Sequence, residues 1–88
     1  MVKSEFLKFE KRLELLYVLK NNGFYVRMHA YEYIVGYGDR LGCIIILEPS
    51  KNLVEIIKLP YSRLNEKQIE HLIRLIKSID KNVVVKLR

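Results

Sequence analysis

Polar side chains that can contact a phosphate recur between residues 67 and 81 of this 88-residue chain. Successive members are three or four residues apart: Lys67, His71, Arg74, Ser78 and Lys81. Side chains at this spacing lie on roughly one side of an α-helix. Such a row can bind the phosphates of a nucleic acid, and a lysine at its end can stabilise a charged transition state. A second interpretation is a solvated surface, in which Lys81 only offsets the helix dipole.

The elements that position this row are well defined by the sequence. Asn65 and Gln68 have the spacing of a capping box, so a helix is expected to begin directly after Asn65. Its buried side is predicted to consist of Ile69, Leu72, Ile73, Ile76 and Ile79. Beyond residues 80–82, Val83, Val85 and Leu87 alternate with other residues as in a strand. Lys81 is therefore expected where a helix ends beside the edge of a sheet.

The first part of the chain predicts another helix, which ends before Gly23. Its packed face is predicted to contain Phe6, Phe9, Leu13, Leu16 and Tyr17. Leu15, Val18 and Leu19 make its last turns apolar nearly all round, so we expect that end to be deeply buried.

Three or four strands are predicted between the helices: 24–31, 43–47 and 53–59, with 33–37 as a further candidate. The predicted order is therefore α-β-β-β-α-β, in one α/β domain over residues 1–88 with a mixed sheet flanked by helices. An aromatic and basic strand face is expected, containing Tyr25, Arg27, His29, Tyr31 and Tyr33. Such a face can stack on bases or contact a second protein subunit.

Composition limits the classes of function. A formal charge of +6 and a pI near 9.6 favour a polyanionic partner, although a Lys- and Glu-rich surface is also typical of ion-pair networks in hyperthermophiles. No apolar run approaches the ~20 residues of a membrane span, so we expect a cytoplasmic protein with no membrane partner. Cys43 is alone in an apolar run and is predicted to be a buried thiol.

No cofactor and no metal site is predicted. Glu32, Asp39, Glu48 and Glu55 do not have the spacing of a carboxylate cluster. Glu55 and Lys58 miss the acid-x-Lys order of metal-dependent nucleases by one residue, and such a shift places a carboxylate on the opposite face of a strand.

Two segments together resemble the catalytic-domain fold of the tRNA-splicing endonucleases, a restriction-endonuclease-like fold. The first is a helix that leads into a Gly-aromatic-x-Val-basic step, with Phe9, Arg12, Leu13, Leu15, Leu16, Leu19, Lys20, Gly23, Phe24, Val26 and Arg27. The second is a helix that ends in a Ser-Ile-x-Lys step, with Leu64, Ile69, Arg74, Leu75, Ser78, Ile79 and Lys81. They cover about half of the chain.

The resemblance implies metal-free cleavage of tRNA introns by a Tyr base, a His acid and a Lys that stabilises the transition state. Only Lys81 matches, because the Tyr position falls on Leu47 and the His position near Asn52. Tyr37 is a possible substitute for the base. The resemblance therefore implies a non-catalytic structural subunit that binds precursor tRNA, through Lys67, His71, Arg74, Lys81 and Arg27, and pairs with a catalytic endonuclease subunit or with itself.

The chain is also similar to the archaeal Holliday junction resolvases, in its first helix, in its Gly-Phe-x-Val step and in a Gln-Ile-x-x-Leu helix. Lys58 would match their strand lysine, but Cys43 and Ile56 stand where that family needs Asp and Glu. This alternative implies a catalytically degenerate protein that binds structured DNA.

Overall fold

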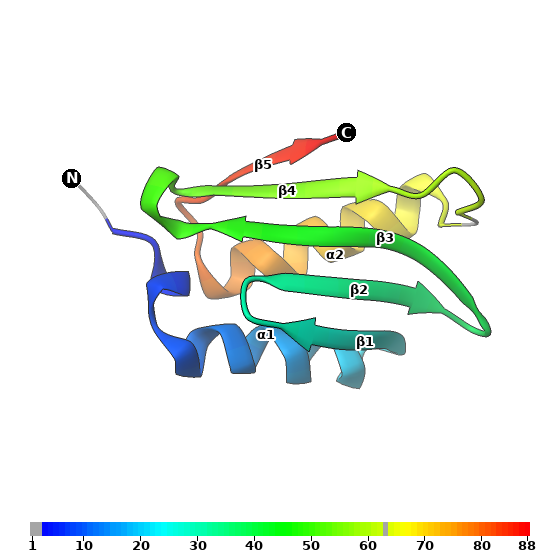
Figure 1. The fold of residues 1–88 in the computed structure, drawn as a ribbon, viewed down its shortest axis with the longest axis horizontal. Helices are drawn as coiled ribbons and strands as arrows, with labels where there is room; N and C mark the ends of the chain where they lie inside the picture. The colour runs from blue at the N-terminus through cyan, green and yellow to red at the C-terminus, as the bar shows by residue number, and fades with distance from the viewer. Residues whose placement is uncertain (1–2, 63) are drawn as a thin grey trace.

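Five strands form one mixed sheet, in chain order, in the computed structural model, which describes residues 3–62 and 64–88 (Figure 1). The elements are the 3-10 turns η1 (Glu5–Leu7) and η2 (Pro49–Lys51), the helices α1 (Phe9–Asn21) and α2 (Glu66–Ile79), and the strands β1 (Phe24–His29), β2 (Glu32–Tyr37), β3 (Arg40–Glu48), β4 (Leu53–Lys58) and β5 (Val84–Leu87). Strands β1 to β4 are antiparallel neighbours. Strand β5 is parallel to β4, because α2 returns the chain along the sheet before β5 begins.

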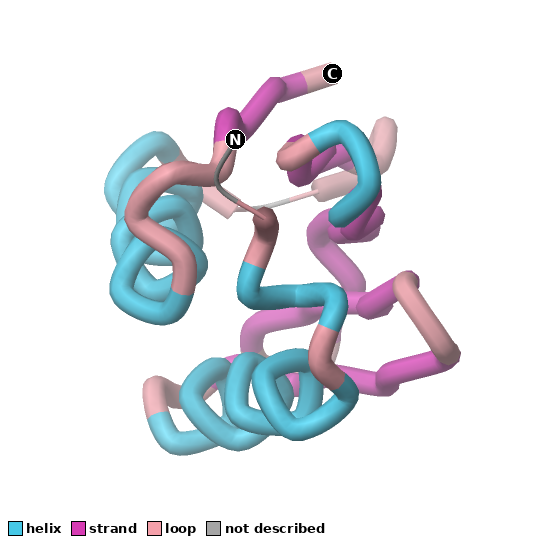
Figure 2. The backbone as a smooth tube through the Cα atoms, turned by 90° about the vertical axis from the view of Figure 1, so that its left-hand side faces the viewer, coloured by secondary structure: helices cyan, strands magenta, loops and turns pink. Residues whose placement is uncertain are grey.

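Both helices cover the same face of the sheet, which curves around them (Figure 2). The inward side chains of the strands and the apolar sides of both helices form a single core. Phe6 of η1 is fully buried in this core. The prediction of an α/β domain with a mixed sheet is confirmed, but the helices form one layer on one side of the sheet. None of the described helices is long and apolar enough to span a membrane.

Helix α2 agrees with the sequence prediction. Asn65 and Gln68 form a complete capping box, in which each side chain accepts from the backbone N–H of the other residue. Ile69, Leu72 and Ile76 are buried against the core. The strong start signal and the apolar spacing therefore fix both the beginning and the orientation of this helix.

The predicted packing face of α1 is wrong. Phe9 is 61% exposed and Tyr17 is 54% exposed, whereas Leu15 and Leu19 are fully buried. Phe6 belongs to the separate turn η1, so it does not share a helical face with Phe9. Because the last turns of α1 are apolar nearly all round, their spacing does not select one face, and the fit against β1 decides which side is buried.

The segment between residues 24 and 37 forms two strands, so four strands separate the helices and the order is α-β-β-β-β-α-β. Residues 30 and 31 form a tight turn in which Ala30 has a left-handed backbone, with φ of 55°. His29 pairs with Glu32, so Tyr33 is opposite Met28 on the helix side of the sheet. Tyr33 is therefore a core residue, and its predicted place on an aromatic and basic face is wrong.

The other side of the sheet has no covering layer among the described residues, and we call it the open face. Its register places Arg27 beside Ile34, Ile34 beside Ile44, and Ile44 beside Ile57. Ile34 is 38% exposed and Tyr25 is 49% exposed. The open face thus has an aliphatic centre next to the polar side chains of β1.

Candidate nucleic-acid interface

The predicted row of polar side chains lies on the outer side of α2. At about 100° per residue, Lys67, Arg74 and Ser78 are roughly opposite to the buried residues Leu72 and Ile76. All three are exposed. Lys81 is also exposed, and it lies in the turn just beyond the end of the helix. We call Lys67, His71, Arg74, Ser78 and Lys81 the basic stripe.

The cations of the basic stripe differ in their partners from Lys8 and Lys11, near the start of α1. On the N-terminal side, Lys8 pairs with Glu5 at 3.5 Å and Lys11 pairs with Glu14 at 3.3 Å. Within the described residues, no carboxylate lies within ion-pair distance of the stripe cations. The charged groups of these exposed cations are therefore available to contact an external polyanion.

His71 is the member of the stripe with a packing role. It is half-buried, and its ring lies 5.8 Å from the ring of Phe24, measured between centroids, with a tilt of 55°. This contact joins α2 to β1, so part of the imidazole surface is unavailable to a ligand. His71 lies at the side of the basic stripe. The charges of the stripe that point to solvent on the helix are those of Lys67 and Arg74.

Arg27 does not join the basic stripe. It lies on β1 and faces the open side of the sheet, whereas α2 covers the opposite side. The polar side chains on this strand are Tyr25, Arg27 and His29, all exposed. The structure therefore separates the predicted nucleic-acid residues into a helix surface and a sheet surface.

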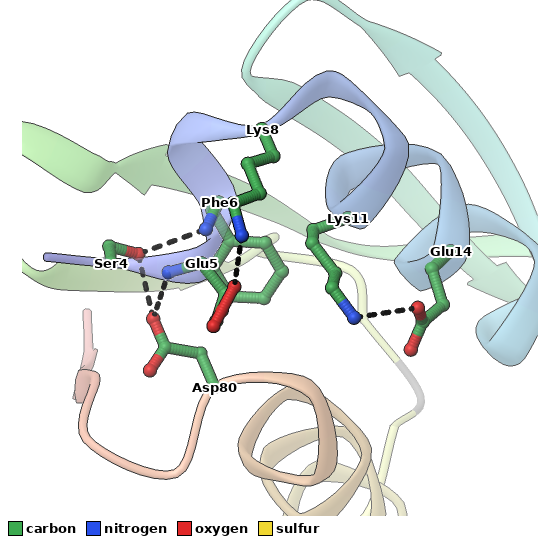
Figure 3. Close-up of polar contacts among 7 residues, drawn as sticks. All are labelled: Ser4, Glu5, Phe6, Lys8, Lys11, Glu14 and Asp80. Carbon is green, nitrogen blue, oxygen red and sulfur yellow. Dashed lines mark hydrogen bonds and ion pairs between the residues drawn. The ribbon is translucent and has the colours of Figure 1, made fainter.

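A buried carboxylate holds the turn that contains Lys81 (Figure 3). Asp80 is 3% exposed, and its Oδ2 accepts from the Ser4 hydroxyl at 2.7 Å and from the Glu5 amide at 3.0 Å. Its Oδ1 accepts from the Asn82 amide at 3.2 Å. Asp80 thus ties the N-terminal segment to the junction of α2 and β5, and it fixes the backbone on both sides of Lys81. The polar sequence from 80 to 82 predicts the end of a helix, but it does not predict this link to the N-terminal segment.

The three positions that the tRNA-splicing resemblance would use for catalysis lie near one end of the sheet. Leu47 is near the end of β3 and is 3% exposed, with its amide bonded to the Tyr31 carbonyl at 2.8 Å. Asn52 has a left-handed backbone, and its Nδ2 donates to the carbonyl of Asn82 at 2.8 Å. Asn82 directly follows Lys81. Neither an alkyl group nor an amide can transfer a proton, so only the lysine of this set has the expected chemistry.

Tyr37 is at the other end of the sheet from Lys81. It pairs with Phe24 at the start of β1, whereas Lys81 precedes the start of β5, beside Asn52. The ring of Tyr37 packs edge-on against Phe24, with 5.7 Å between centroids. Tyr37 therefore cannot act as a base next to Lys81 in this arrangement.

The Holliday junction alternative needs Asp and Glu at the positions of Cys43 and Ile56, and both residues lie in the core. Cys43 is buried in the core as predicted, and burial raises the pKa of its thiol to about 12. Ile56 is fully buried on the neighbouring strand, opposite Ile45. Glu55 is bound by Arg88 at 2.7 Å on the open face. Among the described residues, no group of three or more His, Cys, Asp or Glu side chains could hold a metal ion.

No protein-family model, curated protein or solved structure matches this chain.

Proposed function

We propose that this chain is a non-catalytic nuclease-fold subunit that binds RNA through α2 and supports a catalytic partner in tRNA intron removal. The observation that supports it best is that Leu47, Asn52 and Lys81 all lie near the same end of the sheet. The resemblance assigns a base, an acid and a cation to these positions. In-line attack by a ribose hydroxyl requires all three roles, and this chain supplies only the cation.

The charge on α2 supports RNA as the bound species. Lys67, Arg74 and Lys81 of the basic stripe are exposed, and none of them forms an ion pair within the described residues. Its spacing along a rigid helix suits contacts to phosphates, which fix position without reading sequence. The stripe has no exposed aromatic side chain for base stacking, so it would contact a folded RNA along its backbone.

The open face supports a role in assembly. Ile34, Ile44 and Ile57 lie side by side across three strands, without a covering layer among the described residues. Ile34 is exposed, and Ile44 and Ile57 are half-buried. Contiguous apolar side chains at a protein surface are typical of protein interfaces. The catalytic subunit would pack against this face, on the side of the sheet opposite to the basic stripe.

Cleavage of a precursor tRNA that contains an intron tests the proposal. The purified chain alone is expected to leave the precursor intact, and cleavage is expected when the cognate catalytic subunit is added. If mixing produces no more cleavage than the catalytic subunit alone, the assignment to tRNA splicing is rejected.

RNA binding is tested separately with the double charge reversal K67E/R74E. The loss of two phosphate contacts should weaken binding and lower the slope of log affinity against log salt by about 1.4–1.8. The matched control is K20E/K86E, which reverses two exposed cations outside α2 that, like Lys67 and Arg74, have no ion pair within the described residues. Equal losses in both variants would argue against a specific role of α2, and tighter binding of four-way DNA junctions than of tRNA would favour the junction-binding alternative.

A further inference from the structure

The outer edge of β5 has unpaired backbone groups. On its inner side, the Val84 amide donates to Asn52 at 3.0 Å and the Arg88 amide donates to Ile56 at 2.8 Å. Successive amides of a strand point in opposite directions, so those of Val85 and Leu87 point away from β4. No described strand lies on that side. An edge of this kind can accept a further strand.

Helix α2 has a flank beside this edge, and the two form a cleft. Glu66, Glu70 and Ile73 line the cleft from the helix, and Leu87 lines it from the end of β5. Leu87 is 60% exposed. Lys77 is one helical turn beyond Ile73, so it continues the same flank. The flank is thus acidic in its first half, apolar at Ile73 and basic at Lys77.

We propose that the β5 edge binds a second copy of this chain, related by a two-fold axis perpendicular to the sheet. The two β5 strands then pair antiparallel, with Val85 opposite Val85 of the copy. In this register the outward groups of Val85 exchange two hydrogen bonds with the copy. Leu87 is placed next to Val83 of the copy, on the helix side of the sheet. Lys86 lies opposite Val84 of the copy, so the two Lys86 side chains are not opposite each other.

The same axis makes the flank of α2 complementary to itself. A crossover helix and its strands run in opposite directions, so the two copies of α2 are also antiparallel. Ile73 then lies near Ile73 of the copy, and Glu70 faces Lys77 of the copy. Glu70 and Ile73 line one cleft together with Leu87, so this flank of α2 faces the β5 edge and, across the axis, the same flank of the copy.

Charge complementarity identifies a second copy as the occupant. Within the described part of the chain, neither Glu70 nor Lys77 has an intramolecular ion pair. Any partner must offer a cation opposite Glu70, an apolar group at Ile73 and an anion opposite Lys77, and an antiparallel copy offers all three. The open face and the outer side of α2 remain free in this dimer, so the inference does not depend on the proposed function.

Sedimentation equilibrium of the full chain tests the dimer, with E70K, K77E and the swap E70K/K77E. We expect a concentration-dependent dimer, and each single reversal should raise its dissociation constant about tenfold, because it creates two repulsive contacts per dimer. The swap should restore the affinity of the original chain. The control E10K changes an exposed carboxylate of α1 and should have no effect.

Hydrogen exchange locates the interface without a substitution. The amides of Val85 and Leu87 should become protected as the protein concentration rises. A chain that stays monomeric at all concentrations would overturn the proposal. So would a dimer that is insensitive to E70K and K77E but is lost on substitution of Ile34→Glu, because that result would place the interface on the open face.

Discussion

Replacement of Asp80 by alanine tests whether a buried carboxylate holds the two ends of the chain together. The carboxylate is 3% exposed and accepts three hydrogen bonds, from the Ser4 hydroxyl and from the amides of Glu5 and Asn82. Alanine removes both acceptor oxygens, and so all three hydrogen bonds, and it leaves the donors of the N-terminal segment without a partner in a site that excludes most water.

The cost follows from the strength of these bonds. A hydrogen bond to a charged group contributes about 1.5–3 kcal/mol, and such contributions are not fully additive. The bonds from Ser4 and Glu5 are the shorter two, and together they set an expected loss of about 3–4 kcal/mol for D80A. D80N keeps one acceptor oxygen but turns an NH2 group toward a donor, so we expect a loss of about 1.5–2 kcal/mol.

Urea unfolding followed by far-UV circular dichroism measures these losses. A domain of this size has a free energy of unfolding of about 4–13 kcal/mol, so D80A should also lower the Tm by roughly 15–30 °C. The control D39A changes an exposed carboxylate in the β2–β3 turn and should stay within about 0.5 kcal/mol of the original chain. A loss below about 1 kcal/mol for D80A would refute the view that Asp80 ties the N-terminal segment to the α2–β5 junction.

Three further substitutions or reactions test other features of the fold. Ala30→Gly should raise the free energy of unfolding by about 0.5–1 kcal/mol, because φ at this position is 55° and glycine adopts this left-handed backbone without strain. Thermal unfolding measures the change in stability, and a destabilised variant would contradict the prediction. Gly42→Ala should cost about 1–3 kcal/mol in urea unfolding, because the new Cβ would overlap the side chain of Leu64, and a neutral result would show that this side chain moves aside. Cys43 should not react with a thiol reagent in the folded protein but should react fully in urea, because burial raises its pKa to about 12; rapid labelling of the folded chain would oppose this.

The sequence predicted α2 and its junction with β5 because several local signals agree there. The capping box of Asn65 and Gln68, the spacing of the buried isoleucines and the polar break at residue 80 all specify the same boundaries. Helix α1 lacks this agreement. Its N-terminal end has no side-chain cap, and Lys8 separates it from the turn that contains Phe6. Apolar residues on several sides of α1 then leave the choice of buried face to tertiary packing.

Which side of the sheet the β2 side chains face depends on the number of residues in the turn between β1 and β2. The alternation of apolar and polar residues does not give that number. A turn at Ala30 and Tyr31 was not evident, because Ala rarely adopts a left-handed backbone and neither residue is typical of a hairpin turn. That turn sets Glu32 opposite His29, so the alternation continues with Tyr33 on the buried side. Tyr33 is buried, and its hydroxyl donates a hydrogen bond to the Arg12 carbonyl at 2.7 Å. Tyr33 is therefore a structural residue.

The distribution of charge explains why RNA and protein partners are assigned to different surfaces. Among the described residues, the open face has three cations and three carboxylates: Arg27, Lys86 and Arg88 against Glu32, Glu48 and Glu55. The chain as a whole has a formal charge of +6, and the described cations that exceed the carboxylates lie off the open face, on the helical layer and at the ends of the sheet. A polyanion is therefore attracted to the side that contains α2, and the nearly neutral, aliphatic open face gains most from contact with another apolar surface.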